Sequence, residues 1–337
     1  MLFMINSNKM FFLFILFFST LISISSNSWL GCWIGLEINL LSFIPLISNS
    51  NNLMNSEASL KYFLTQTIAS INFLFSILLK MFFMKNFLLN DLFSIMINMS
   101  LLMKMGSAPF HFWFPNIIEG LSWLNCFILM TWQKISPMIL LSYYFNMNFI
   151  LIIMIMNTII GVIGSFNQNS IRKLLAFSSI NNLGWMLASI LISESIWNLF
   201  FIMYSFLNMI MCFIFYLINI FYINQMYNFN LNFFIKISIM INFMSLGGLP
   251  PFLGFFSKWI VINFLINNNL ILICFFFIMM SLIMIFVYIR IIYSSLLFYN
   301  FKTKWFKINI KNKYFHLINF ISFISLIGMI FSTFFFF

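Results

Sequence analysis

Charged residues are scarce in this chain of 337 residues. Asp, Glu, Lys and Arg together make up 6% of the sequence, whereas 63% of it is hydrophobic and the mean hydropathy is +1.06. A soluble domain of ordinary composition has about a quarter of its residues in those four charged types. The scarcity of charge therefore excludes a soluble globular protein.

Residues that hold metals and redox centres are also few. The chain has two histidines, His111 and His316, and four isolated cysteines without a C-x-x-C motif. A membrane haem needs facing axial ligands, and an iron–sulfur cluster needs a group of cysteines. The dinucleotide-binding motif G-x-G-x-x-G is also missing. We therefore expect this chain to bind no cofactor and no metal.

The sequence does contain a succession of long apolar segments. Windows near 20 residues long, enough to cross a hydrocarbon core of about 30 Å, follow one another along the chain. Counting them predicts an all-α polytopic membrane protein with about eleven transmembrane helices. The predicted segments are residues 9–26, 29–47, 57–79, 90–113, 120–145, 148–166, 171–192, 195–222, 232–266, 269–298 and 316–336.

Two of these segments contain a Gly/Pro cluster at membrane depth. The cluster KMGSAPF interrupts the fourth segment, and GGLPPFLG interrupts the ninth. The fourth helix is thus broken in each of two sets of five helices. This predicts two repeats, at 9–145 and 148–298. A final helix at 316–336 completes a single membrane domain of residues 1–337. Five is an odd number, so the second repeat is predicted to be inverted, as in transporters that place irregular backbone at a midplane site.

The net charge of +11 is explained by membrane topology. Most cations fall in predicted loops and at helix ends, so they do not indicate nucleic-acid binding. With alternating helices, one side receives Lys9, Lys61, Arg172, Lys173, Lys236, Lys302, Lys304, Lys307, Lys311 and Lys313, and the other receives Lys80 and Lys85. The N-terminus is predicted on the cation-rich side and the C-terminus on the other.

Three of the five acidic residues are interpreted as interfacial charges. Glu57, Glu119 and Glu194 are each expected in the first turn of a helix, where an acid complements the helix dipole. Lys61 follows Glu57 at the i+4 position, which favours an ion pair along the helix.

Four other ionisable residues lie well inside apolar segments: Glu37, Lys104, Lys134 and Lys258. Burying a charge at membrane depth costs at least about 2.5 kcal/mol, so such residues are functional candidates by default. Arg290 is a fifth candidate, although it is close enough to a helix end for its side chain to snorkel.

These residue types at this depth predict a proton relay. Desolvation disfavours the ammonium form of a lysine, whereas a carboxylate about 4 to 6 Å away stabilises it. If Glu37 lies that close to Lys104, moving one proton switches the charge of the pair. The alternative is structural, with the lysines bonding carbonyls that the helix breaks expose. It is strongest for Lys258, which follows a break, and it also applies to Lys134, which precedes Pro137.

Several motifs resemble a known family in their order and spacing between residues 27 and 260. They are NSWLGCWIGLEINLLSFIPL, SEASLKYFLTQ, KMGSAPFHFWFPNIIEG, MTWQKISP, RKLLAFSSINNLGWM and SLGGLPPFLGFFSKW. Together they closely resemble the antiporter-like membrane subunits of respiratory complex I, and among these the subunit 2 family of the mitochondrial NADH dehydrogenase.

The resemblance implies a role for each buried charge. Glu37 corresponds to the family's membrane glutamate, Lys104 to the lysine of the first broken helix, Lys134 to the central-axis lysine and Lys258 to the lysine of the second broken helix. The sequence departs from the pattern at Asn182, where many relatives have a histidine. An asparagine cannot titrate near pH 7, so this position cannot carry a proton as histidine does.

The resemblance also implies a setting. We expect a translocase subunit of proton-pumping NADH:ubiquinone oxidoreductase in the mitochondrial inner membrane, with its N-terminus in the matrix and its C-terminus in the intermembrane space. NADH, FMN, iron–sulfur clusters and ubiquinone would be bound by other subunits. Expected neighbours are subunits 3, 4L and 4, accessory subunits and lipids such as cardiolipin, and no homo-oligomer is expected. Two alternatives stay open: a stand-alone cation/proton antiporter, and a structural membrane-arm subunit that does not pump.

Overall fold

The computed structural model describes residues 7–49, 52–83, 90–228, 233–297 and 312–333. The described residues form helices, and the β-type contact among them is one isolated antiparallel bridge between Ser170 and Tyr222. The predicted all-α class is therefore confirmed. The chain divides into two compact units, Met1–Ile153 and Met154–Phe337.

Eight of the described helices are long and apolar enough to cross a membrane, and three shorter apolar helices accompany them. Large hydrophobic side chains such as Phe11, Phe14 and Phe18 are exposed on their outer faces. Apolar surface of this extent matches lipid and not water. The chain is therefore a multi-pass membrane protein, whereas the count of about eleven helices stays a prediction.

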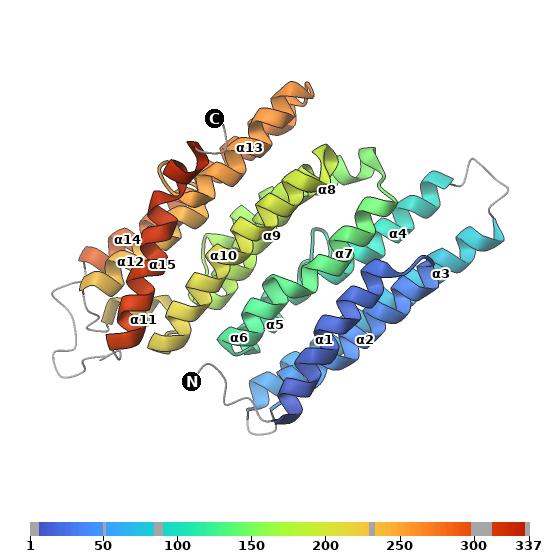
Figure 1. The fold of residues 1–337 in the computed structure, drawn as a ribbon, viewed down its shortest axis with the longest axis horizontal. Coiled ribbons are helices and arrows are strands. Elements are labelled where there is room, and N and C mark those ends of the chain that lie inside the picture. The colour runs from blue at the N-terminus through green and yellow to red at the C-terminus, as the bar shows by residue number, and fades with distance from the viewer. Residues whose placement is uncertain (1–6, 50–51, 84–89, 229–232, 298–311, 334–337) are drawn as a thin grey trace. The chain divides into compact units, whose positions relative to one another are not determined.

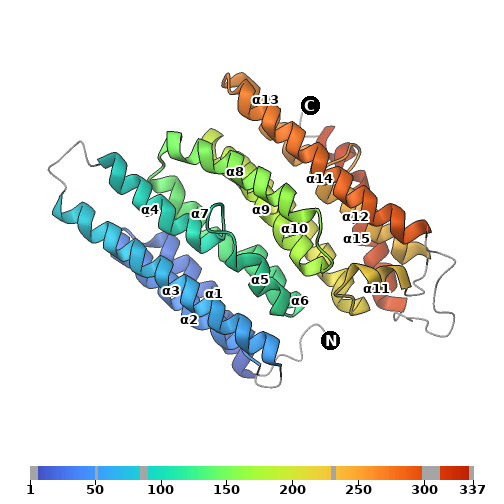
Figure 2. The same cartoon turned by 180° about the vertical axis from the view of Figure 1, so that it is seen from behind.

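The first unit is a bundle in which α1, α2 and α3 pack side by side and α4 packs on α3 (Figures 1 and 2). Close approach of α1 and α2 depends on Gly35, because a Cβ atom there would lie 2.7 Å from the Ser23 backbone. The helices of this unit are α1 (Ser7–Ser25), α2 (Trp29–Ile47), α3 (Leu53–Phe82), α4 (Asn90–Met105), α5 (Trp113–Gly120), α6 (Trp123–Met130) and α7 (Trp132–Tyr143).

The second unit is built around α9, most of whose residues are buried. This helix packs against α10 and α13, while α12 packs against α14 and α15 (Figure 2). The division between the units falls within α8 (Met147–Ser165). The following helices are α9 (Ile171–Ile192), α10 (Glu194–Ile218), α11 (Ile223–Asn228), α12 (Phe233–Gly247), α13 (Leu253–Asn267), α14 (Ile271–Leu297) and α15 (Asn312–Thr333).

Both predicted helix breaks are present. The first lies between α4 and α5, and the second lies between α12 and α13. Gly106 has a φ of +70° and Gly248 a φ of +82°. This left-handed region favours glycine, so each break begins where the chain can turn without a side-chain clash. The boundaries of the two repeats, 9–145 and 148–298, stay a prediction.

The segment predicted at 120–145 is present as one candidate membrane span, Trp123–Tyr143, and its helix has an irregularity that the sequence did not predict. The helix is interrupted at Thr131, whose hydroxyl donates to the Phe127 carbonyl at 2.7 Å. Pro137 lies within α7 and has no N–H to donate to the carbonyl four residues earlier, at Gln133. The hydrogen-bond ladder is therefore weakened in the turns that contain Lys134.

Two of the three acids that were predicted in a first turn lie elsewhere in their helices. Glu57 is the fifth residue of α3, because that helix already begins at Leu53 after the N-cap Asn52. Glu119 lies near the end of α5, because the preceding break ends earlier than expected. The interpretation of Glu194 is confirmed, and so is the Glu57–Lys61 ion pair, with an N–O distance of 2.5 Å.

We predict that Gly254→Ala destabilises the chain strongly. A Cβ atom at this position would lie 1.7 Å from the Ser245 carbonyl oxygen, so α13 would have to move away from α12. Overpacking of this kind costs about 1–3 kcal/mol or more in the free energy of unfolding. Detergent-induced unfolding followed by circular dichroism measures the loss. Gly247→Ala is the matched control, because its nearest neighbour is a side-chain atom of Ile285 at 3.1 Å, and equal stability of the two variants would contradict the prediction.

Candidate functional site

Glu37 and Lys104 interact across a gap in the first unit. Lys104 lies in the last turn of α4 and is 7% exposed, and the Glu37 carboxylate on α2 attracts its ammonium group. Among the described residues, however, the direct ion pair is the one between Lys61 and Glu57. The Oε1 atom of Glu37 is buried and accepts no hydrogen bond from the described residues. The two charges are thus coupled without being locked together.

The carbonyls freed at the end of α4 are satisfied by neighbouring helices. Gln66 on α3 donates from Nε2 to the Lys104 carbonyl at 3.1 Å, and Trp113 on α5 donates from Nε1 to the Met103 carbonyl at 3.2 Å. Helix ends need such partners because their last carbonyls have none within the helix. The ammonium group of Lys104 is therefore not the cap of this break, which argues against a purely structural role.

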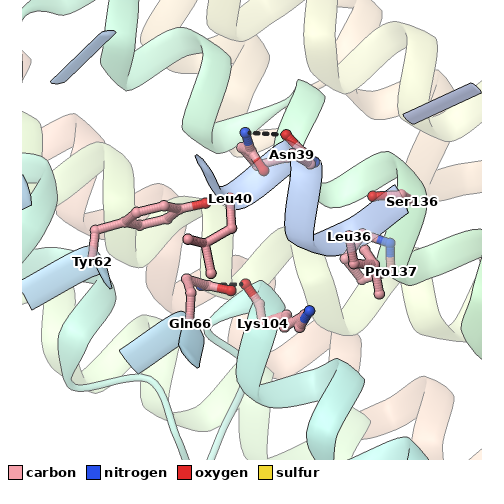
Figure 3. Close-up of a pocket in the computed structure, with 9 residues that line it drawn as sticks. Leu36, Asn39, Leu40, Tyr62, Gln66, Lys104, Ser136 and Pro137 are labelled. Carbon is pink, nitrogen blue, oxygen red and sulfur yellow. Dashed lines mark hydrogen bonds between the residues drawn. The ribbon is translucent and has the colours of Figure 1, made fainter. Parts of the chain in front are cut away.

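A small polar cavity adjoins Lys104 (Figure 3). Its volume is about 10 Å³, which is room for about one water molecule. The wall includes a hydrogen bond of 2.9 Å from Gln133 Nε2 to Asn39 Oδ1. Side chains from α2, α3, α4 and α7 converge here: Leu36, Asn39, Leu40, Tyr62, Gln66, Lys104, Gln133, Ser136 and Pro137. The cavity therefore joins Lys104 to the helix that carries Lys134.

Lys134 is almost completely buried. It is 1% exposed, and its Nζ lies 5.2 Å from the centroid of the Phe114 ring on α5. A cation over an aromatic face is stabilised by the ring quadrupole. Its neighbours Gln133 and Ser136 face the cavity beside Lys104. The structure thus brings Glu37, Lys104 and Lys134 onto adjoining helices of one unit.

Lys258 belongs to the second unit and has a different environment. It is 6% exposed, and its Nζ donates to the Gly247 carbonyl at 2.7 Å and more weakly to the Leu246 carbonyl at 3.5 Å. These carbonyls lie at the end of α12, so Lys258 caps the second break. Its Nζ also lies 5.8 Å from the centroid of the Trp185 ring. The alternative interpretation, in which a lysine bonds carbonyls that a helix break exposes, thus describes part of the role of Lys258.

A second small cavity adjoins Lys258. Its volume is about 10 Å³, and Asn182, Tyr204 and Ser257 are among the residues that line it. Asn182, for which the family resemblance implied a histidine, therefore lies beside Lys258. The Tyr204 hydroxyl, on α10, is hydrogen-bonded to Ser179, which lies one turn before Asn182 on α9. Among the residues that line this cavity, the polar side chains other than Lys258 are thus hydroxyls and an amide.

Sequence reasoning missed three residues of these surroundings. Lys236 was counted among the cations on one side of the membrane, at the start of a predicted helix; it lies in the first turn of α12 but is only 6% exposed. Tyr62 and Gln66 are 3% and 5% exposed and lie four residues apart, so they form a polar stripe on one face of α3 that helical spacing could have revealed.

No group of three or more His, Cys, Asp or Glu side chains gathers in the described part of the chain. Cys32, Cys126, Cys212 and Cys274 are buried and form no disulfide bonds. The expectation that cofactors are bound by other proteins is not tested by these findings and stays a prediction.

Comparison with known families accounts for this arrangement. The family model described as NADH:quinone oxidoreductase/Mrp antiporter, TM, matches residues 26–284, a range that includes Glu37 and the buried Lys104, Lys134 and Lys258. The chain belongs to this family. Among curated members, NADH-ubiquinone oxidoreductase chain 2 of Anopheles gambiae is 49% identical over 324 residues, which cover 95% of each chain.

Solved structures of the NADH:quinone oxidoreductase/Mrp antiporter type share the fold. A chain of respiratory complex I from Thermus thermophilus, solved with bound aureothin, superposes with a TM-score of 0.83 at 16% identity, covering 96% of this chain and 78% of that one. A chain of the Mrp complex from Dietzia sp. gives a TM-score of 0.73 at 14% identity, covering 83% and 59%. At these identities the likeness concerns the fold alone.

We predict that Lys258→Met lowers the stability of the chain. The methionine cannot donate to the Gly247 carbonyl, and an unsatisfied buried acceptor costs about 1–3 kcal/mol in the free energy of unfolding. Detergent-induced unfolding measures the loss. The control is Lys61→Met, which removes an exposed ion pair worth less than about 1 kcal/mol. If Lys258→Met unfolds at the same detergent concentration as the unaltered chain, the capping role is wrong.

Proposed function

We propose that this chain is a core membrane subunit of a proton-translocating NADH:ubiquinone oxidoreductase and conducts protons through its buried Glu and Lys residues. The observation that carries the proposal is that Lys104 lines a polar cavity, to which α2 and α7, the helices of Glu37 and Lys134, also contribute side chains. Membership of the family and the names of the curated relatives support it.

The first step of the mechanism concerns the pair of Glu37 and Lys104. The carboxylate stabilises the ammonium group of Lys104 through Coulomb attraction. When a proton reaches Glu37, that attraction is lost, and the buried ammonium is left to the desolvation that disfavours it. Lys104 then releases its proton toward the cavity, where Tyr62 and Gln133 supply polar groups. An electrostatic signal at Glu37 is thereby converted into proton movement.

Lys134 and Lys258 take the later steps in this proposal. Lys134 receives the proton on the α7 side of the cavity. Its neighbours Gln133 and Ser136 line the cavity there. Lys258 acts as the far relay in the second unit, where its amine already contacts the polar backbone of a helix break. A protonated lysine donates three hydrogen bonds, so the carbonyls at this break favour the charged form. Asn182 supplies an amide beside Lys258 but carries no proton.

Redox chemistry is assigned to other subunits. In this proposal they bind NADH, FMN, iron–sulfur clusters and ubiquinone, and this chain contributes only translocation. We place it in the mitochondrial inner membrane, beside subunits 3 and 4L on one side and subunit 4 on the other, with accessory subunits and lipids such as cardiolipin around it. It is not proposed to form a homo-oligomer.

The orientation follows the distribution of cations. We propose that the N-terminus lies in the matrix and the C-terminus in the intermembrane space, because Lys9 and the pair Arg172 and Lys173 fall on one side. Lys85 and the cations between residues 302 and 311, which entered the same count, lie outside the described residues. Lys236 no longer supports it, because it is buried.

A stand-alone cation/proton antiporter is the second candidate, favoured by the likeness to a chain of an Mrp complex. We predict that the chain migrates on a native gel within a very large assembly that also oxidises NADH. Solubilisation in a mild detergent, followed by a native gel and an in-gel NADH stain, is the measurement. Migration of the intact chain near its own mass of 40.0 kDa would favour the antiporter.

We predict that Lys104→Met in the assembled complex lowers proton pumping and quinone reduction together. Loss of a proton-transferring group reduces the rate by a factor of about 100 or more where that transfer limits turnover. Pumping is measured with a pH-sensitive dye in vesicles, and quinone reduction by NADH consumption. Lys61→Met, which removes one exposed lysine, should leave both rates unchanged. Full activity of Lys104→Met in both assays would refute the relay and favour a structural subunit that does not pump.

A further inference from the structure

The second unit contains a polar cavity whose wall does not include Lys258. Its volume is about 130 Å³. The polar side chains in its wall are Ser165, Gln168, Asn169, Asn224, Tyr227 and Arg290. They come from the end of α8, the α8–α9 connection, α11 and α14. Apolar side chains form the rest of the wall.

The rim of this cavity is held in place by the backbone. The Ile171 N–H donates to the Phe221 carbonyl, and the Ile223 N–H donates to the Asn169 carbonyl, both at 3.0 Å. These bonds tie the α8–α9 connection to the start of α11. Arg290 donates from its guanidinium to the Phe166 carbonyl of the same connection. The pocket is therefore formed in advance of any ligand.

Arg290 brings a permanent positive charge to the pocket. The guanidinium is not deprotonated in proteins, and it has five N–H donors, of which the Phe166 carbonyl takes one. After residue 154 the sequence contains a single acidic residue, Glu194, at the start of α10. The opposite end of that helix, at Ile218, lies about 36 Å away along the helix axis. The C-terminal end of α10, which precedes α11 and the pocket, therefore has no carboxylate side chain to pair with Arg290.

The depth of Arg290 matches the headgroup layer of a membrane. It lies six residues from the midpoint of α14, or about 9 Å along the axis, while half the hydrocarbon core is about 15 Å thick. An arginine side chain spans the difference by snorkelling. On the same helix face, Phe286, Ile289 and Tyr293 are 56%, 41% and 61% exposed, which offers apolar surface to an acyl chain.

We propose that this pocket binds the phosphate group of an anionic phospholipid, with Arg290 as its counter-ion. Guanidinium pairs with phosphate through two parallel hydrogen bonds, and the hydroxyl and amide groups of the wall complete the coordination of the oxygens. The exposed apolar face beside Arg290 favours a lipid over free phosphate, because a lipid satisfies both the charge and the hydrocarbon surface. The site is independent of the proton relay.

Photolabelling of the assembled complex tests this site. The probe is a phosphatidylglycerol with a photoreactive group next to its phosphate, and the labelled residues are located by mass spectrometry. Labelling is expected around the pocket, between residues 165 and 169 and between 287 and 294. Arg290→Gln loses the charged hydrogen bonds and is expected to reduce this labelling about tenfold. The matched control is Arg172→Gln, which removes a guanidinium that packs on the Phe221 ring at 4.6 Å and does not line the pocket.

Each outcome of this experiment decides the proposal. Equal labelling of Arg290→Gln and Arg172→Gln would overturn it. If excess inorganic phosphate displaces the label, the occupant is free phosphate and the assignment to lipid is wrong. Should the variants fail to assemble, the unaltered complex still decides: a phosphatidylcholine probe, which has no net charge, must label the pocket several-fold less than phosphatidylglycerol, and equal labelling contradicts the proposal.

Discussion

The burial of charge in apolar surroundings is the constraint on which this structure depends. Glu37, Lys104, Lys134 and Lys258 lie among apolar helices, where an ion is expensive unless polar groups surround it. Each unit meets this requirement in its own way. In the first, a carboxylate and a small polar cavity accompany Lys104, and in the second, carbonyls of a helix break receive the Lys258 amine.

The helix breaks make these environments available. A continuous helix keeps its backbone polar groups within itself and offers nothing to a buried ion, whereas a break exposes carbonyls at membrane depth. At the first break, side chains of α3 and α5 take those carbonyls, so the Lys104 amine stays outside the capping. At the second break the lysine itself is the cap. The two lysines therefore differ in the groups that their amines contact.

Much of the fold was predictable because hydrophobic length and Gly/Pro clusters report directly on membrane helices. The segment 171–192 was predicted at its observed bounds, and both breaks were located from Gly106 and Gly248. The burial of Lys104, Lys134 and Lys258 was also predicted from sequence, because each lies inside an apolar run, whereas Glu37 is half-buried. Interactions between distant segments were not predictable in this way. The hydrogen bond from Gln66 to Lys104 spans 38 residues, and the burial of Lys236 depends on packing that its position near a helix end conceals.

Water in the cavity beside Lys104 is the most direct test of the account, because the proton must cross from α4 to α7 at that point. A density map of the assembled complex at a resolution that reveals ordered solvent is the measurement. We expect a water molecule within hydrogen-bond distance of the Lys104 amine or its polar neighbours Gln133 and Ser136. A map in which apolar side chains close this space and separate Lys104 from α7 would contradict the relay.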